Sequence, residues 1–365
     1  MTERAPRVLV TGALLGQPMG GVRRHNSELL PRVAADLAKE GGRLAILTGR
    51  NPLELDSTYE FELLPSDVPA GPPLARARKE ARALRDALER AAWEGRPFDL
   101  VHTGHLPAPT QLSVPYTLTL HDLRRLHSWP GRWFARPIIA RGIERAVGVI
   151  TVSETVRDEI QQSFHPRRTW VVSNAADHLR LEARSSPDPP FLLHVGHVEP
   201  RKNLGLLLRA LAVEAALPNL LLVGAPKARE AERLRALARR LGVEQRVTFA
   251  GPVPETELPR LYATCACAVF PSRIEGFGIG VLEAMRAGAP IAIARAGALE
   301  EIAGPDAPNF APNDPPECVR ALRQALRRTA ADRDRLMERA SSFSWSRSSS
   351  RLLSIWREVA AHQTG

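Results

Sequence analysis

The sequence predicts an α/β fold in which two doubly wound, mostly parallel sheets follow one another along the chain. Its 365 residues exceed one ordinary core and favour two domains of roughly 180 residues each. Short apolar, strand-like runs alternate with helical patterns from end to end, which is typical of parallel sheets covered by helices. The second half repeats the alternation of the first. Two Rossmann-like units in tandem are therefore the simplest interpretation.

Apolar periodicity places the individual elements. We expect strands in the first half near 7–11, 44–48, 99–102, 115–119 and 148–152. Helices are expected between these strands near 21–38, 74–93, 133–146 and 153–163. In the second half, strands are expected near 191–195, 219–223, 246–250, 267–270 and 290–294.

A Pro- and Ser-rich stretch at 184–190 separates the two halves, because it can continue neither a helix nor a central strand. We therefore predict an N-terminal domain over 1–183 and a C-terminal domain over 184–345. A helical segment over 346–365 follows. Trp345 and Trp356 are expected to be packing residues in this last part of the chain.

Composition restricts the class of protein. A hydrophobic content of 44% and a charged content of 25% are those of a soluble globular protein. No apolar run reaches the roughly 18 residues of a membrane span, and the run at 8–10 is too short for a signal peptide. We therefore expect a cytoplasmic protein. Its cysteines, Cys265, Cys267 and Cys318, are too few for a disulfide framework or a zinc site and are expected in the core.

The formal net charge of +10 raises the question of nucleic-acid binding. The basic excess is spread over both halves, so no nucleic-acid partner is predicted. The helix expected at 74–93 is basic, however, and Trp133 and Phe134 lie beside Arg132 and Arg136. Basic helices with aromatic neighbours can lie on anionic lipid, although most such faces are simply solvated. Peripheral contact with the inner face of the membrane is therefore a further expectation.

The densest motif runs from Phe270 to Met285 and predicts a strand, a Gly-rich loop and a helix. It places Glu275 in the loop and Glu283 on the helix. The helix start presents unpaired backbone N–H groups and a positive dipole end, which suit a phosphate. Ionised carboxylates accept hydrogen bonds from sugar hydroxyls on either side of it. A sugar diphosphate fits this layout. The alternative is a solvated Glu283 next to a sharp turn.

A second charged turn follows the strand expected at 191–195. Gly196 and His197 come directly after that strand, and Arg201 and Lys202 lie at the start of the next helix. Two such cations bind a diphosphate strongly through charge-assisted hydrogen bonds. A solvated helix start is the alternative.

Two features of the first half could also contact a ligand. Gly20 and Gly21 open a helix and leave backbone N–H groups accessible to a phosphate. Their loop is neither a dinucleotide-binding G-x-G-x-x-G nor a Walker A sequence, which argues against hydride transfer and P-loop ATPases. His121 follows the strand expected at 115–119, and open α/β sheets bind ligands at such carboxyl ends. A packing turn and a structural histidine are the alternatives.

Together these motifs resemble glycosyltransferase family 4, the retaining nucleotide-sugar enzymes of GT-B architecture. The resemblance spans the chain and is densest at 191–204 and 267–303, where Glu275 and Glu283 match the Glu-x7-Glu signature. It implies two Rossmann-like domains that face an interdomain cleft, with a C-terminal helix that crosses back to the N-terminal domain. It also implies that the C-terminal domain binds the nucleotide sugar and the N-terminal domain binds the acceptor.

The resemblance implies a role for each matched residue. Glu275 would contact the transferred sugar and His121 would position sugar and acceptor, so these two are the catalytic candidates. Glu283 would bind the nucleoside ribose, and Lys202 would bind the donor diphosphate. The other donor-binding candidates are Gly20, Gly21, Gly196, His197, Arg201, Val253, Gly276, Phe277, Gly278 and Ile279.

Two positions depart from the family pattern. His197 stands where many members carry an Arg directly after the Gly, and Ala175 replaces the Gly of an Asn-Gly-Val-Asp turn. Phosphate neutralisation would then be weaker, pH-dependent or shared with Arg201. The turn from Glu199 to Asn203, with a residue other than Arg before it, resembles that of mannosyl- and related transferases of surface polysaccharide assembly, which points toward GDP-mannose.

The function implied is that of a metal-independent, retaining hexosyltransferase. It would move a hexose from a GDP- or UDP-linked sugar to a glycan or lipid-linked acceptor in polysaccharide, glycolipid or glycoconjugate assembly. No cofactor and no metal are expected. The alternatives are an epimerase or a sugar phosphorylase on the same scaffold and a non-catalytic anion-binding protein. A pyridoxal phosphate phosphorylase would need a Schiff-base lysine, and the second domain offers only Lys202 and Lys227.

Overall fold

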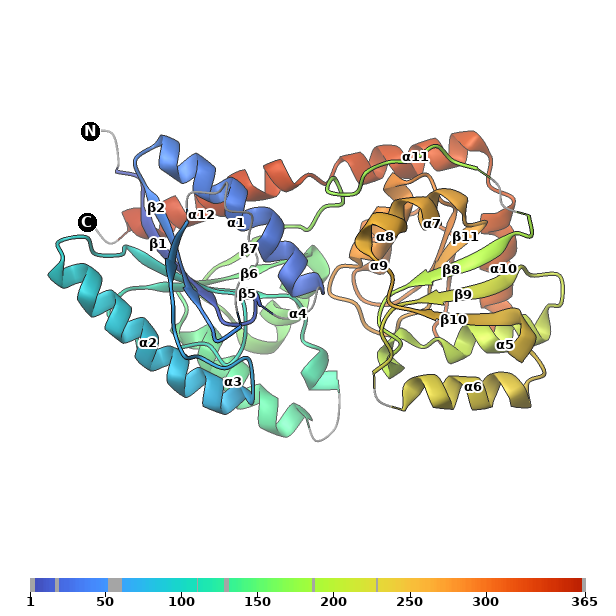
Figure 1. Ribbon diagram of the computed structural model, residues 1–365, viewed down its shortest axis with the longest axis horizontal. Coiled ribbons are helices and arrows are strands. Elements are labelled where there is room, and N and C mark those ends of the chain that lie inside the picture. Colours follow the sequence, from blue (N-terminus) through green and yellow to red (C-terminus); the bar gives the residue numbers. More distant parts are fainter. Residues whose placement is uncertain are drawn as a thin grey trace. The chain divides into compact units, whose positions relative to one another are not determined.

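The structure is a computed structural model that describes residues 4–16, 20–51, 61–109, 111–127, 131–185, 188–227 and 229–362. The chain divides into two compact units (Figure 1). Unit 1 comprises Met1–Asn174 and Trp345–Gly365, and unit 2 comprises Ala175–Ser344. The chain thus leaves unit 1 after Asn174, before the Pro- and Ser-rich stretch at 184–190.

Unit 1 is built on a parallel sheet with the described strand order β3-β2-β1-β4-β5-β6-β7. Its strands are β1 (Arg7–Gly12), β2 (Arg43–Thr48), β3 (Glu62–Leu64), β4 (Leu100–Thr103), β5 (Tyr116–Leu120), β6 (Gly148–Thr151) and β7 (Thr169–Val171). Its helices are α1 (Gly21–Lys39), α2 (Pro73–Trp93), α3 (Gly131–Arg145), α4 (Glu154–Phe164) and α12 (Trp345–Ala361), with a 3-10 turn η1 (Arg124–His127).

Unit 2 repeats the scheme with the described strand order β10-β9-β8-β11-β12-β13. Its strands are β8 (Phe191–Val195), β9 (Asn219–Val223), β10 (Val247–Gly251), β11 (Cys267–Phe270), β12 (Ile291–Ala294) and β13 (Asn309–Phe310). Its helices are α5 (Gly205–Val213), α6 (Glu230–Arg240), α7 (Leu258–Thr264), α8 (Ile279–Arg286), α9 (Leu299–Ala303), α10 (Pro315–Leu326) and α11 (Ala330–Ser341). Its 3-10 turns are η2 (Pro200–Lys202), η3 (Glu244–Arg246) and η4 (Glu255–Glu257).

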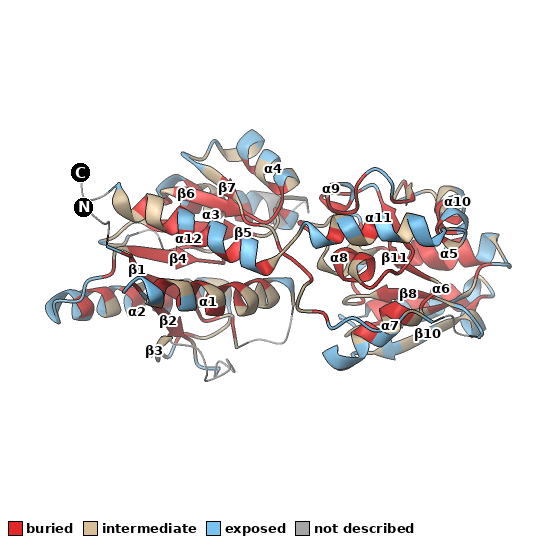
Figure 2. Cartoon of the chain, turned by 90° about the horizontal axis from the view of Figure 1, so that it is seen from above, coloured by how far each residue is buried: buried red, intermediate tan, exposed pale blue. Residues whose placement is uncertain are grey.

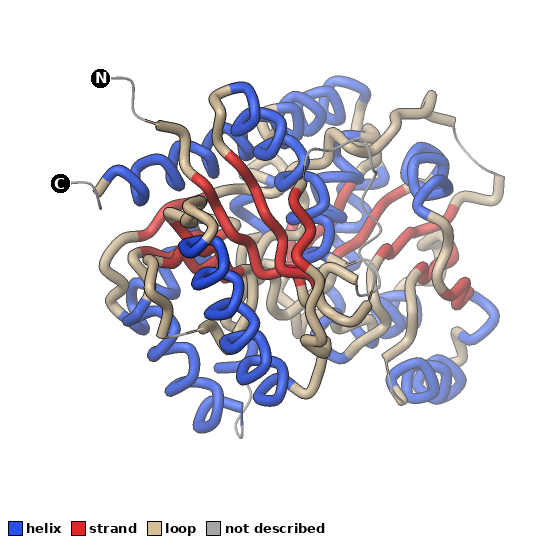
Figure 3. Tube along the Cα trace, turned by 60° about the vertical axis from the view of Figure 1, so that its left-hand side comes forward, coloured by secondary structure: helices blue, strands red, loops and turns tan. Residues whose placement is uncertain are grey.

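Each sheet lies inside its own layer of helices (Figure 3). The central strands are buried along their length because helices cover both faces of a parallel sheet. Accordingly, the residues of β4, β5 and β6 in unit 1 and of β11 and β12 in unit 2 are all buried. Figure 2 shows the central strands as buried and the outer helix faces as exposed. The three cysteines are free and buried, as predicted.

The predicted parallel α/β architecture is confirmed in both units, and every strand and helix placed by periodicity is present. The short strands β3, β7 and β13 were not predicted. Each has two or three residues and ends its sheet, so it carries too little apolar pattern to be recognised.

The C-terminal helix α12 belongs to unit 1, where it packs along α1. Its tryptophans Trp345 and Trp356 are fully buried, which confirms that they are packing residues. None of the helices in the described ranges combines the length and the hydropathy that a membrane span requires.

The strand order of each sheet reverses at one point, between β1 and β4 in unit 1 and between β8 and β11 in unit 2. Open parallel sheets bind ligands outside the carboxyl ends of their strands at such a switch point. A ligand site in unit 2 is therefore expected at the segments that follow β8 and β11.

Candidate functional site

Two loops meet at the switch point of unit 2, one after β8 and one after β11. Asn203, at the end of the first loop, donates a hydrogen bond from Nδ2 to the carbonyl oxygen of Pro271 at 3.1 Å. The backbone N–H of Arg273 donates to the carbonyl oxygen of Arg201 at 2.9 Å. Asn203 adopts a left-handed conformation with φ 55°, which Asn tolerates better than most residues. These bonds hold the cations of the first loop against the second.

Glu275 lies between the two cations of the first loop. Lys202 Nζ is 2.5 Å from Glu275 Oε1, and Arg201 Nη1 is 3.0 Å from Oε2. Ser272 donates a further hydrogen bond from its hydroxyl to Oε1 at 2.8 Å. The structure thus brings together Arg201, Lys202 and Glu275, as the prediction of a charged site requires.

Electrostatics keep Glu275 ionised. Burial alone would raise the pKa of its carboxyl group, but the charges of Lys202 and Arg201 and the hydrogen bonds from Lys202 and Ser272 outweigh it and lower the pKa to about 2. At neutral pH this side chain is therefore a hydrogen-bond acceptor only, which suits contact with sugar hydroxyls.

The backbone around Glu275 is tightly packed. Gly297 has φ 56°, and a Cβ atom there would lie 2.3 Å from the carbonyl oxygen of Glu275. That carbonyl accepts a hydrogen bond from the N–H of Ala298 at 3.0 Å. A side chain at 297 would therefore displace the loop that carries Glu275.

Helix α8 begins directly after this loop. Gly278 precedes its first residue, Ile279, with φ 97°, and a Cβ atom at Gly278 would lie 2.7 Å from Leu299 Cδ2. Phe277 is buried, with its ring edge-on to that of Phe343. Gly276 thus lies in the same loop as Glu275, and the first N–H groups of α8 follow directly after that loop, as predicted.

Glu283 is a buried residue of α8 and not a solvated one. Its Oε2 accepts a hydrogen bond from the hydroxyl of Tyr262 at 3.1 Å, and its Oε1 lies 3.1 Å from His178 Nε2. Burial and the neighbouring Glu283 raise the pKa of Tyr262 well above its usual range, so the hydroxyl remains a donor. Each carboxylate oxygen retains a second lone pair for a ribose hydroxyl.

The remaining candidates of unit 2 lie at the same edge of the sheet. Gly196 follows β8 with φ 148°, and Lys202 Nζ would lie 3.5 Å from a Cβ atom there. His197 and Val253 are partly exposed residues that follow β8 and β10. Burial is the main cause that lowers the pKa of His197 from its usual value. This histidine therefore adds no charge at neutral pH.

In unit 1, Gly20 and Gly21 lie at the start of α1, which begins at Gly21. Gly20 has φ −164°, an extended conformation that any residue adopts, and an added Cβ atom would meet no described atom within 4 Å. The packing of the described residues does not require glycine at 20.

His121 follows β5 at the carboxyl edge of the unit 1 sheet. Its ring lies edge-on to that of His25, with 4.9 Å between the centroids. Burial, followed by the charges of His25, His102 and Arg124, lowers the pKa of His121 well below its usual value. Its buried Nε2 has no hydrogen-bond partner among the described residues. The imidazole is therefore neutral and only weakly basic, and because a general base works best with a pKa near the working pH, this suits a positioning group better.

Four contacts around these candidates were not predicted. They are made by Tyr262 and His178 with Glu283, by Ser272 with Glu275, and by His25 with His121. His25 is fixed in turn by Asn174, whose Oδ1 lies 2.8 Å from His25 Nδ1. Most of these partners are far apart in sequence, so no local motif indicates them.

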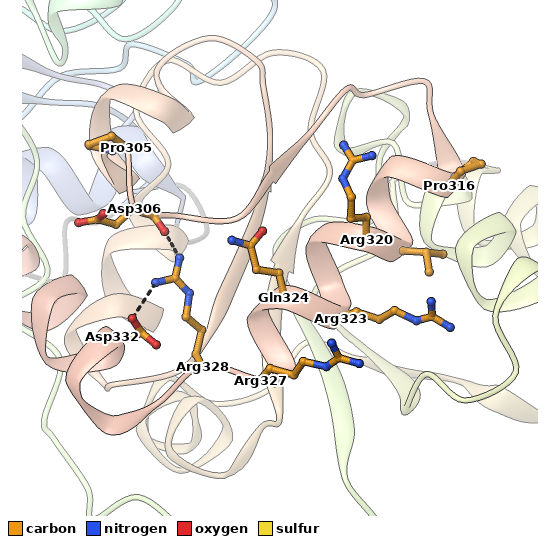
Figure 4. Close-up of a pocket in the computed structure, with 10 residues that line it drawn as sticks. Pro305, Asp306, Pro316, Arg320, Arg323, Gln324, Arg327, Arg328 and Asp332 are labelled. Carbon is orange, nitrogen blue, oxygen red and sulfur yellow. Dashed lines mark hydrogen bonds and ion pairs between the residues drawn. The ribbon is translucent and has the colours of Figure 1, made fainter.

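A groove beside α10 is lined by several arginines but by none of the predicted site residues (Figure 4). Arg328 lies between Asp306 and Asp332, and Arg320 pairs with Glu317 at 2.9 Å. Arg328 bonds the backbone carbonyl oxygen of Asp306, and Arg323 pairs with Glu214. Because none of the residues predicted to bind the donor lines this groove, we assign no donor site there. Within the described ranges, no cluster of three or more His, Cys, Asp or Glu side chains could hold a metal ion.

Comparison with known proteins agrees with the fold. The family model described as Glycosyltransferase Family 4 matches residues 19–180, and that described as Glycosyl transferases group 1 matches residues 177–343. Together the two matches cover most of the chain.

Two relatives match over nearly their whole length. O-antigen chain mannosyltransferase B of Escherichia coli is 26% identical, over 93% of this chain and 96% of the relative. D-inositol 3-phosphate glycosyltransferase of Thermobispora bispora is 28% identical, over 98% of this chain and 95% of the relative.

Solved structures share the fold. Sucrose-phosphate synthase from Thermosynechococcus elongatus superposes with a TM-score of 0.75 at 20% identity, over 98% of this chain and 100% of that chain. Anabaena Alr3699/HepE, solved with UDP and glucose, gives a TM-score of 0.72 at 20% identity, over 97% and 100%.

The fold and the matches define a glycosyltransferase of GT-B architecture, an enzyme of glycan biosynthesis. The chain belongs to glycosyltransferase family 4.

Proposed function

We propose that this glycosyltransferase transfers a hexose, with retention of the anomeric configuration, from a nucleotide-diphosphate sugar to an acceptor hydroxyl. The observation that carries the proposal is the position of Glu275 between Lys202 and Arg201 at the switch point of unit 2. An ionised carboxylate beside two cations offers complementary partners for sugar hydroxyls and for a diphosphate.

In this proposal the donor lies on unit 2. Lys202 and Arg201 exchange the carboxylate of Glu275 for oxygens of the diphosphate, and the N–H groups at the start of α8 donate to the same group. Glu275 then accepts hydrogen bonds from the hexose, and Glu283 accepts them from the ribose. Glu283 is held ready for this by Tyr262 and His178.

The proposed step breaks the bond between the sugar C1 and the diphosphate oxygen. The acceptor oxygen bonds to C1 from the same face, and its proton passes to the departing phosphate. Negative charge develops on the leaving group as the bond breaks, so donors already in place act mainly on the transition state. We propose that the positive charges of Lys202 and Arg201 neutralise this negative charge and that no cofactor or metal ion is required. Loss of turnover in chelator, restored by Mg²⁺ or Mn²⁺, would refute metal independence.

The nucleotide is proposed to be GDP or UDP. The relatives include mannosyltransferases, and the solved neighbour Alr3699/HepE binds UDP. The proposal is tested by incubating the full chain with UDP- and GDP-hexoses, with and without glycan or lipid-linked acceptors. We expect nucleoside diphosphate release that depends on the acceptor and a product with the donor's anomeric configuration. Donor isomerisation without acceptor would instead indicate an epimerase.

The acceptor is proposed to be presented at a membrane surface. The exposed large apolar side chains of unit 1 include Leu74 on α2, exposed by 61%, and Trp133 and Phe134 on α3, exposed by 70% and 77%. An apolar hollow lies beside them, lined by Pro72, Pro73, Leu74, Leu106, Pro107, Ala135, Ile138 and Ile139.

Basic side chains extend this apolar surface along α2. Arg78 and Arg85 lie on the same helix face as Leu74 by helical spacing, and both are exposed. Apolar insertion together with arginines on acidic headgroups would hold unit 1 on an anionic bilayer.

Vesicle co-sedimentation tests this contact. Replacing Trp133 and Phe134 by Ser should weaken binding to vesicles that contain phosphatidylglycerol. Trp93→Ser is the matched control, because Trp93 is 90% exposed at the other end of α2. Equal binding of the wild type and the double variant would exclude this surface.

A further inference from the structure

The segment that follows β9 places Lys227 beside the charged turn that follows β8. Val198 and Pro226 form a parallel bridge between the two segments. The N–H of Lys227 donates to the carbonyl oxygen of Val198 at 2.9 Å, and the N–H of Val198 donates to the carbonyl oxygen of Ala225 at 3.0 Å. The carboxyl-end segments of two neighbouring strands therefore run side by side.

Glu199 joins Lys227 to the predicted diphosphate cations. Lys227 Nζ is 2.9 Å from Glu199 Oε2, and Arg201 Nη2 is 2.7 Å from Oε1. Arg201 also contacts Glu275, which pairs with Lys202. Positive and negative side chains thus alternate from Lys227 to Lys202. Three cations face two carboxylates in this row.

Glu199 is a buried residue and remains ionised. Burial would raise its pKa, but the hydrogen bond from Lys227 and the charges of Arg201, Lys227 and Lys202 lower it below the usual value. A buried carboxylate with a cation on each oxygen holds both cations in place before any ligand arrives.

His197 makes a further cation useful at this point. It stands directly after Gly196, at the position where the resemblance to family 4 implies an Arg. Burial is the main cause that lowers its pKa, and Lys227 is the next. The position after Gly196 therefore carries no charge at neutral pH, while a lysine from the neighbouring segment lies close to it.

We propose that Lys227 is a third cation of the donor diphosphate site and supplies the positive charge that position 197 lacks. The inference rests on the proposed function, because it assumes that unit 2 binds a nucleoside diphosphate. Lys227 is half exposed, and its flexible stem can turn from Glu199 to a phosphate oxygen. The alternative role is structural, in which Lys227 only neutralises the charge of the buried Glu199.

The test compares variants of the full chain by calorimetric titration. Lys227→Gln removes the charge, and Lys227→Arg keeps it. Arg239→Gln is the matched control, because Arg239 is an exposed cation of the same unit in an ion pair with Glu244, at the far end of α6. The probes are UDP and GDP, with the monophosphate and the nucleoside of whichever base binds the wild type.

We expect Lys227→Gln to raise the Kd of the nucleoside diphosphate about tenfold, as a lost charge-assisted hydrogen bond implies. The Kd of the nucleoside should stay within about twofold of the wild type, since it has no phosphate. Lys227→Arg should restore most of the diphosphate affinity, and Arg239→Gln should bind as the wild type does.

Three results would overturn the inference. An unchanged diphosphate Kd with a lower melting temperature would show a structural role for Lys227. An equal loss for nucleoside and diphosphate would place Lys227 on the base or ribose. If neither UDP nor GDP binds the wild type, the proposed donor fails first, and the role of Lys227 fails with it.

Discussion

Tyr262 donates a hydrogen bond from its hydroxyl to Glu283 Oε2 across 3.1 Å in the interior of unit 2. His178 lies at the same distance from the other carboxylate oxygen. Two side chains from different segments therefore fix the orientation of Glu283. A carboxylate held in this way needs little reorganisation when a ribose binds, which favours tight nucleotide binding.

Tyr262→Phe should therefore weaken both stability and nucleotide binding. The change removes one hydroxyl and leaves a buried carboxylate oxygen with one donor fewer, at a cost of about 1–3 kcal/mol. We expect a lower melting temperature for unit 2 and a severalfold weaker affinity for the nucleoside part of the donor. Thermal melts and titration with the nucleoside measure the two effects, and wild-type values in both would show that this hydrogen bond is unimportant.

Glu275→Gln should lower turnover far more than it weakens nucleotide binding. The amide keeps the shape of the side chain but removes the charge that Lys202 and Arg201 neutralise. Steady-state rates at saturating donor should fall by at least about 100-fold, a loss comparable to that of one preorganised transition-state contact. The Kd of the nucleoside diphosphate should change by less than about tenfold. Unchanged turnover would remove Glu275 from the catalytic residues.

Gly297→Ala should disturb the same loop through its backbone. The new methyl group would lie 2.3 Å from the carbonyl oxygen of Glu275, in addition to the strain at φ 56°. Gly242→Ala is the matched control, because Gly242 has φ 69° and an added Cβ atom meets nothing within 4 Å. The control should lose about 1 kcal/mol of stability, and Gly297→Ala should lose clearly more and also lose turnover. Equal melting temperatures for the two variants would contradict the packing described here.

Buried histidines should make unit 1 sensitive to acid. Burial lowers the pKa of His25 to about 4. Burial, followed by the charges of His25 and His105, lowers the pKa of His102 to about 3. The unfolded chain binds these protons near pH 6.5, so stability is complete above that pH and falls as the pH drops toward 4. Each pKa unit corresponds to about 1.4 kcal/mol.

The acid sensitivity can be assigned with one variant. His102→Gln should lower the melting temperature at pH 7 but flatten its decline between pH 7 and pH 5. His362→Gln, which changes an exposed histidine, should leave the wild-type pH dependence intact. An undiminished decline in His102→Gln would show that other groups cause it.

The regular parts of the fold follow from local pattern, because buried strands and amphipathic helices each carry a repeat of their own. The pairs that shape the site do not. Lys202 and Glu275 are 73 residues apart, and His178 and Glu283 are 105 residues apart. Residue type and neighbouring glycines marked Lys202, Glu275 and Glu283 as candidates, but only the strand order brings Lys202 to Glu275. Nothing near Tyr262 in the sequence points to Glu283.

A thermal-shift screen of the full chain with UDP, GDP, ADP and dTDP tests donor binding to unit 2 most directly, with Lys202→Met measured in parallel. Ligands that bind only the folded state raise its melting temperature according to their affinity. We predict a clear rise for UDP or GDP in the wild type and a much smaller rise in Lys202→Met. No rise with any nucleotide, or the same rise in both proteins, would contradict a diphosphate site built on Lys202 and Glu275.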